Sequence, residues 1–260
     1  MRFTFTGPQG KSGRQFKVTD HPLKTLPQFY VTAPAPCPYL PGRTERKIFA
    51  HLLGDSARVI HDSLTAAGFR RSQHIAYKPA CGACNACVSV RVPVAQRQFS
   101  RSQKRNLSLN SHLIREPKGA LASAEQFELL RSYLKARHPE GGMAEMGPRD
   151  YAAMVEETPI ATGLVEYRHT CGKLVGCTLM DRLSDGLSMV YSFYDPHPDY
   201  RGLGTFMVLD HMNYVAELGL DYLYLGYWVE GCRKMDYKRR FRPLETLGPN
   251  GWQSAQDTES

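Results

Sequence analysis

The chain has 260 residues, and its 33 Lys and Arg against 25 Asp and Glu give a net charge of +8. Ordinary apolar and charged fractions exclude wholesale disorder and collagen-like repeats, and apolar runs such as residues 177–180 are far too short to span a bilayer. The positive charge favours an anionic partner, with nucleic acid or phosphate first, although a merely soluble basic surface fits it equally well.

The first residues and the cysteines bear on the compartment. Residues 1–5 include no apolar core of a secretory signal. Seven cysteines are an odd number, so we expect thiols or metal ligands in a reducing, cytoplasmic setting and not a disulfide framework. No membrane association is expected.

The first half predicts two helices and a strand. Residues 56–67 place apolar side chains on one helix face, and alternating valines predict a strand over residues 88–94. Pro93 lacks a backbone donor, which places this strand near a sheet edge. Ser123 and Gln126 form a capping box that begins the second helix.

The second half is typical of a sheet with helices. A hairpin over residues 172–194 is followed by a Gly-bearing loop at 200–204, a helix over 205–218 and a strand over 220–225. A strand, loop, helix and strand in this order predict a β-α-β unit.

These patterns predict an α+β protein of two domains. We divide the chain into a loose lead-in (1–28), a smaller cysteine-containing domain (29–105), a larger domain (106–248) and a polar, frayed tail (249–260).

Three cysteines follow each other at C-x₂-C-x₂-C spacing. Cys81, Cys84 and Cys87 can converge from a tight loop, and Cys37, between two prolines, is the natural fourth ligand. Zinc or an iron–sulfur cluster would suit four thiolates. The alternative is a packed thiol loop without metal.

A basic helix face is predicted next. Arg101, Lys104 and Arg105 share one face at i, i+3 and i+4, which suits phosphates. A solvated basic face is the alternative.

The glycine loop of the β-α-β unit is a candidate anion site. Arg201, Gly202 and Gly204 lie where a helix N-terminus presents backbone N–H groups. The loop resembles the R-x-x-G-x-G/A loop of GNAT acyltransferases, but Phe206 occupies the final small position, which counts against acyl-coenzyme A.

Basic and aromatic residues alternate near the C-terminus. Rings can stack on bases while cations meet phosphates, and the alternative is strand-end core aromatics beside a solvated charge run. The aromatic candidates are Tyr227, Trp228 and Tyr237, and the basic ones are Lys238, Arg239 and Arg240.

Several spaced motifs together resemble the aminoacyl-tRNA–protein transferases, and more narrowly their short bacterial, leucine-transferring members. The motifs are residues 37–40, 77–79, the cysteine run, 191–196 and 235–243. The resemblance implies an N-terminal cysteine-bearing domain followed along the sequence by a GNAT-like C-terminal domain. It further implies transfer of leucine from Leu-tRNA to the N-terminal Asp or Glu of acceptor proteins, which marks them for degradation by the N-degron route.

The implied chemistry needs no cofactor for acyl transfer, because an aminoacyl ester is already activated. The enzyme must hold ester and amine together and stabilise the tetrahedral oxyanion. Tyr191 and Asp195, at the end of the strand before the glycine loop, are candidate positioning residues.

Three other functions stay open from the residues alone. Arginine can replace leucine as the transferred amino acid, since side-chain chemistry does not decide the donor. A GNAT acetyltransferase and a non-catalytic zinc-ribbon RNA-binding protein are the remaining alternatives.

Overall fold

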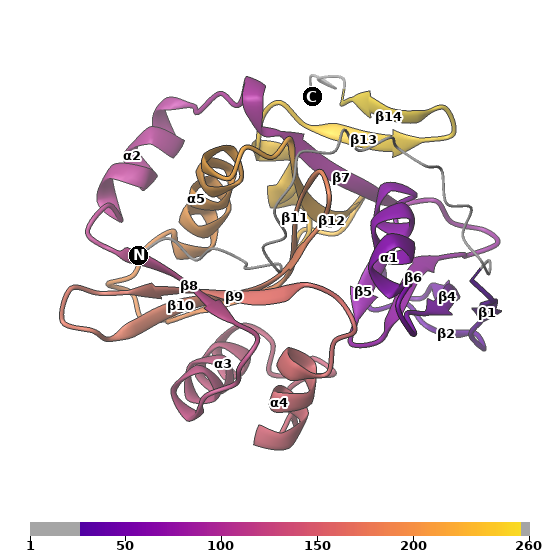
Figure 1. Cartoon of the computed structure of the whole chain (residues 1–260), viewed down its shortest axis with the longest axis horizontal. Coiled ribbons are helices and arrows are strands. Elements are labelled where there is room, and N and C mark those ends of the chain that lie inside the picture. Colours follow the sequence, from indigo (N-terminus) through magenta and orange to yellow (C-terminus); the bar gives the residue numbers. More distant parts are fainter. Residues whose placement is uncertain (1–26, 256–260) are drawn as a thin grey trace, which may run out of the picture.

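An eight-stranded sheet forms the centre of the molecule (Figure 1). The computed structural model describes residues 27–255, so nearly all of the predicted lead-in lies outside the described residues. The strand order is β14-β13-β7-β12-β11-β10-β9-β8. These strands are β7 (Cys87–Pro93), β8 (Ile114–Gly119), β9 (Thr162–Arg168), β10 (Leu174–Arg182), β11 (Gly186–Tyr194), β12 (Tyr222–Val229), β13 (Glu245–Gly248) and β14 (Gly251–Ser254).

Helices cover both faces of this sheet. Helix α5 (Leu203–Glu217) packs on one face with α2 (Arg101–Leu109) beside it, and α3 (Ala124–Arg137) and α4 (Pro148–Glu156) pack on the other (Figure 1). Strand β10 is buried along almost its whole length because helices shield both of its faces.

A smaller sheet lies at the N-terminal side, in the order β1-β4-β6-β5. Helix α1 (Ala57–Ala66) packs its Ile60 and Leu64 against Ala50 and Ala76 of this sheet. The strands are β1 (Phe29–Val31), β4 (Lys47–His51), β5 (Arg70–Ser72) and β6 (Ile75–Pro79), and β2 (Ala35–Pro36) with β3 (Thr44–Glu45) forms a separate ribbon.

The main sequence predictions are confirmed. Helix α3 begins at the predicted capping box, in which Ser123 accepts from the Gln126 amide. Strands β10 and β11 form the predicted antiparallel hairpin. Strand β11 pairs in parallel with β12, and helix α5 connects the two strands. The protein is therefore α+β, with the predicted β-α-β unit.

Two predictions are wrong. Strand β7 is not near an edge but lies between β12 and β13, and Pro93 is tolerated because it is the last residue of the strand. Residues 251–254 of the supposedly frayed tail form β14, because Trp252 is held by a 2.8 Å hydrogen bond from its Nε1 to the Ala66 carbonyl oxygen. Strand β7, from the cysteine-containing part of the sequence, thus belongs to the large sheet.

Candidate active site

The parallel strands β11 and β12 separate soon after they begin. Their pairing covers only residues 186–188 and 222–224, and the register of β12 against β7 shifts at Gly226. We call the region between residues 189–194 of β11 and 225–229 of β12 the strand split. Backbone carbonyl groups that lose a strand partner there must find other donors.

Arg70 supplies one set of donors from the smaller sheet. Its Nη2 donates to the carbonyl oxygens of Met189 and Val190, at 3.0 and 2.9 Å. A side chain of β5 therefore takes the place that a neighbouring strand would have occupied beside β11. The guanidinium brings a permanent positive charge to the strand split.

Lys238 supplies the other donor. It lies in the short helix η2 (Asp236–Arg240), is buried, and its Nζ donates to the carbonyl oxygen of Tyr227 at 2.6 Å. Burial lowers the pKa of Lys238 well below its usual value, and the charge of Arg70 lowers it further. Two basic groups that are remote in sequence thus lie near each other at the split.

Gly226 makes the position of Arg70 feasible. Its φ is +75°, and a Cβ at this residue would lie 1.3 Å from Nη1 of Arg70. The sequence contained a signal for this contact, because an isolated glycine inside a strand often marks a bulge or a close approach. Nothing in the sequence identified Arg70 itself as the group that approaches.

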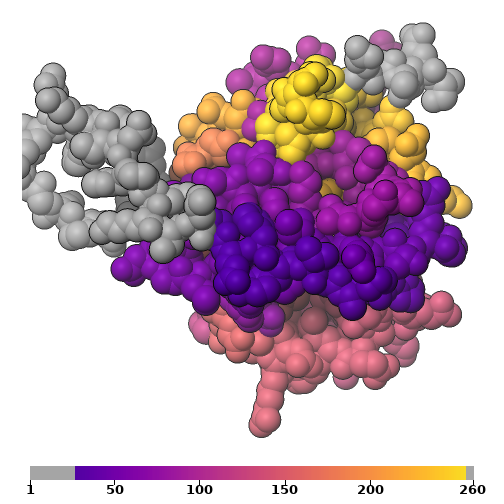
Figure 2. Space-filling model, turned by 90° about the vertical axis from the view of Figure 1, so that its right-hand side faces the viewer, coloured from indigo at the N-terminus to yellow at the C-terminus, as the bar shows by residue number. Residues whose placement is uncertain are grey.

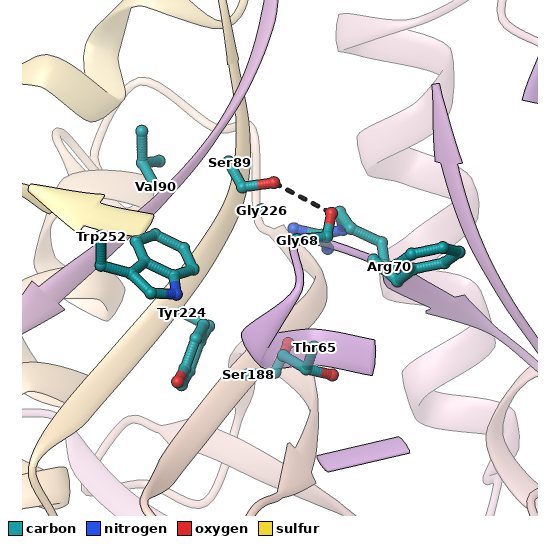
Figure 3. A pocket seen from close by; sticks show the side chains of 10 residues that line it. Thr65, Gly68, Arg70, Ser89, Val90, Ser188, Tyr224, Gly226 and Trp252 are labelled. Atoms are coloured by element: carbon teal, nitrogen blue, oxygen red, sulfur yellow. Dashed lines mark hydrogen bonds between the residues drawn. The ribbon is translucent and has the colours of Figure 1, made fainter. Parts of the chain in front are cut away.

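A hydrogen bond between Ser89 and Gly68 fixes the backbone close to Arg70 (Figure 3). Ser89 Oγ and the Tyr227 hydroxyl both donate to the carbonyl oxygen of Gly68, each at 2.9 Å. The cavity that Arg70 shares with Tyr224 and Trp252 has a volume of about 10 Å³, room for about one water molecule. These hydrogen bonds tie the backbone two residues before Arg70 to strands β7 and β12.

Tyrosine rings surround the other side of the split. The rings of Tyr194, at the end of β11, and Tyr133, on α3, are 5.0 Å apart. A Cβ at Gly204 would lie 2.9 Å from the Tyr194 ring, so the start of α5 packs directly on the end of β11. Burial raises the pKa of Tyr133 above its usual range, as do the neighbouring Tyr194, Tyr191 and Tyr237.

Comparison with known proteins identifies the family of this chain. The model described as "Arginine-tRNA-protein transferase, N terminus" matches residues 35–105, and that described as "Arginine-tRNA-protein transferase, C terminus" matches residues 125–248. The chain is 57% identical over 237 residues to the aspartate/glutamate leucyltransferase of Parvibaculum lavamentivorans, covering 91% of this chain and 98% of the relative.

The chain belongs to the arginine-tRNA-protein transferase family.

A second member, the aspartate/glutamate leucyltransferase of Sphingopyxis alaskensis, is 53% identical over 90% of this chain and 94% of its own length. Among solved structures, FemX superposes with a TM-score of 0.45 at 10% identity, covering 72% of this chain and 64% of that one. L-PGS from Bacillus licheniformis gives 0.42 at 12% identity, covering 55% and 46%.

Helix α2 brings the predicted phosphate-binding segments of this family member together. Gln103 Nε2 donates to the carbonyl oxygen of Arg240 at 2.8 Å, and Asn106 Nδ2 donates to that of Gly202 at 3.2 Å. The basic face of α2 thus adjoins both η2 and the glycine loop. The exposed basic residues of these three segments are Arg101, Lys104, Arg105, Arg201 and Arg240.

Two predicted contact residues are not at the surface. Lys238 is 6% exposed and Tyr227 is 2% exposed, so neither presents its polar group to solvent where a phosphate or a base could reach it. The hydrogen bonds of both side chains to backbone carbonyls explain their burial. Trp228 is partly buried, with the guanidinium of Arg239 5.0 Å from its ring, and Tyr237 is 41% exposed.

The two predicted positioning residues are both partly buried beside the split. Tyr191 packs near Phe193 on the α3 side, and burial raises its pKa to about 12. Asp195 directly follows β11, forms a 2.9 Å ion pair with Lys173 and accepts from the His197 amide. Their roles stay predictions.

The four cysteines lie near one another but do not form a metal site as placed. Burial and the neighbouring thiols of Cys37, Cys81 and Cys84 raise the pKa of Cys87 to about 11, while Cys84 Sγ accepts a 3.1 Å hydrogen bond from Arg43. Across residues 27–255, no three His, Cys, Asp or Glu side chains are grouped to hold a metal ion. Metal, iron and sulfide analysis of protein purified without oxygen tests the prediction of zinc or a cluster.

Proposed function

We propose that this chain is an aminoacyltransferase that moves leucine from Leu-tRNA to the N-terminal Asp or Glu of acceptor proteins. The observation that carries the proposal is the 57% identity to a leucyltransferase along 98% of that relative's length. The strand split, with its two basic groups, is the place we assign to the reaction. In the described part of the chain no helix is long and apolar enough to cross a membrane, and we propose a cytoplasmic reaction.

The reaction replaces an ester by an amide. The neutral α-amine of the acceptor attacks the ester carbonyl carbon, and the carbonyl oxygen becomes an oxyanion. When this intermediate collapses, the bond to the ribose oxygen breaks, the amine proton is released and the ribose oxygen takes up a proton. An α-amine has a pKa near 8, so a substantial share is already nucleophilic at neutral pH.

The positive charge at the split suits two anionic groups of this reaction. The oxyanion forms beside the substrate carbonyl, and the acceptor brings a carboxylate side chain. A cation in a water-poor site stabilises either group more strongly than it would in water. Arg70 is the group we assign to this charge, and we propose Tyr191 and Asp195 as positioning residues around the substrates.

A transfer assay tests the proposal directly. Leu-, Arg- and Phe-tRNA are offered separately with peptides that begin with Asp, Glu, Arg or Ala. We expect leucine on the Asp and Glu peptides only. Transfer from Arg-tRNA without transfer from Leu-tRNA would replace the donor and keep the class, whereas acetylation of the peptides from acetyl-coenzyme A would overturn the class. RNA binding without any transfer would favour the non-catalytic alternative.

The matched variants are Arg70→Met at the split and Arg131→Met on the exposed face of α3. We expect Arg70→Met to lower kcat at least tenfold and Arg131→Met to leave it within twofold of the wild-type value. Equal activity of both variants would remove Arg70 from the reaction.

A further inference from the structure

A row of aromatic rings crosses the smaller sheet and ends at Arg70. The strand register places Tyr30 of β1 opposite Phe49 of β4, Phe49 opposite Tyr77 of β6, and Tyr77 opposite Arg70 of β5. Directly paired residues point to the same face of a sheet. The four side chains therefore stand in one line, which begins at the edge strand and ends in the strand split. At about 4.8 Å between strands the line is about 14 Å long.

The outer end of this row is accessible. Tyr30 is 40% exposed, and its ring lies 5.4 Å from that of Phe49 in a nearly parallel arrangement. His51 lies next to both rings and stacks on His74 with an interplanar angle of 6°. Figure 2 shows the N-terminal strands, in indigo, at the surface of the molecule. The opposite face of the sheet is covered by helix α1.

This face carries two cationic side chains, Arg70 at the end of the row and Lys47, which is paired with a carboxylate. Lys47 stands beside the row, with its Nζ 5.7 Å from the centre of the Tyr77 ring and 2.8 Å from the Glu45 carboxylate. None of the described strand positions on this face of the smaller sheet is Asp or Glu. The positions on this face are Tyr30, Lys47, Phe49, His51, Arg70, Ser72, Ile75, Tyr77 and Pro79.

We propose that this aromatic row is a stacking surface for unpaired nucleotides, namely those adjacent to the aminoacyl ester of the donor RNA. This inference rests on the proposed function, because it assigns the path by which the RNA end enters the split. Rings stack on bases of any sequence, and cations beside them meet phosphates. An acidic peptide would bind the cations but would have no use for a line of three aromatic rings. The row therefore favours RNA, whose bases can stack on the rings.

Binding of a short RNA tests the inference without requiring transfer. The probes are a fluorescent unpaired RNA tetranucleotide with the sequence of a tRNA 3′ end, and intact uncharged tRNA. Tyr30→Val and Phe49→Val remove the rings while keeping residues that favour strands. Val59→Ala, at an exposed position of α1 on the other side of the sheet, is the matched control. Thermal unfolding of every variant checks that the fold is kept, and Tyr30→Phe retains the ring if Tyr30→Val does not fold.

We expect each ring deletion to weaken tetranucleotide binding about tenfold, and the double variant more, with the control within twofold of wild type. In transfer assays the KM for Leu-tRNA should rise while kcat and the KM for the peptide stay unchanged. Folded variants that bind the tetranucleotide as wild type does would overturn the inference and leave the proposed function standing. A rise in peptide KM alone would assign the row to the acceptor instead. If the wild-type protein transfers no leucine but the ring deletions still weaken RNA binding, the aromatic row is an RNA-binding surface and the proposed function is wrong.

Discussion

Arg71 holds Asp181 through two hydrogen bonds that join the smaller sheet to the larger one. Its Nε and Nη2 donate to the two carboxylate oxygens of Asp181 at 2.7 and 2.8 Å, and both side chains are buried. Thr162 Oγ1 donates to the same carboxylate at 2.8 Å. Because Arg71 is the neighbour of Arg70 on β5, its bonds to Asp181 of β10 fix the strand that carries Arg70 to β11.

Removal of one partner of this pair should destabilise the fold. Asp181→Asn leaves the Arg71 charge buried without its counter-charge, and we expect the free energy of unfolding to fall by about 3–5 kcal/mol. Chemical denaturation measures the change. Glu128→Gln, which breaks the exposed Arg131–Glu128 pair, should cost less than about 1 kcal/mol. Similar losses in both variants would show that the Arg71–Asp181 pair does not join the sheets.

A methyl group at Gly226 should displace Arg70. We expect Gly226→Ala to lower kcat at least tenfold, because the guanidinium must leave the Met189 and Val190 carbonyl groups. Gly172→Ala is the matched control, since its φ of +89° carries the same backbone strain but no atom lies within 4 Å of the added carbon. In a background that already carries Arg70→Met, Gly226→Ala should have a much smaller effect. Full additivity of the two changes would contradict the contact.

Acid should weaken the fold through His211. Complete burial lowers the pKa of His211 to about 4, whereas the unfolded chain binds a proton near pH 6.5. The unfolded state therefore binds more protons between these values, so the stability is fully present above pH 6.5 and falls as the pH drops towards 4. The expected loss is about 3 kcal/mol.

Denaturation curves of wild type and His211→Gln at several pH values isolate this contribution. The difference in unfolding free energy between the two proteins should shrink as the pH falls from 6.5 to 4. His112→Gln, at an exposed position, should follow the wild-type curve. A constant difference between wild type and His211→Gln would show that this histidine does not titrate as described.

The basic face of α2 should contact RNA phosphates. Replacing Arg101, Lys104 and Arg105 by Gln should weaken tRNA binding, and the slope of log affinity against log salt should fall by roughly one unit for each lost contact. Arg131 and Lys135, exposed on α3 at the opposite face of the sheet, provide a control variant. An unchanged slope in the triple variant would leave these residues as a solvated face.

The sequence by itself determined the local elements and the family resemblance. Capping residues such as Ser123 and Gln126 act on backbone groups within one turn, and the glycines near residue 202 act on their own loop, so neighbouring residues were sufficient to predict them. The same holds for the hairpin of β10 and β11, whose turn residues fix its register.

Only the tertiary structure decided which basic residues are buried and which are exposed. Lys238 and Arg240 belong to one basic run, yet the first is buried on the Tyr227 carbonyl group and the second faces solvent. Arg70 gave no sequence signal, because its partners are carbonyl groups about 120 residues away that lack donors only where two strands separate. Unsatisfied backbone groups at such a point depend on the pairing of the whole sheet, and local sequence does not encode that pairing.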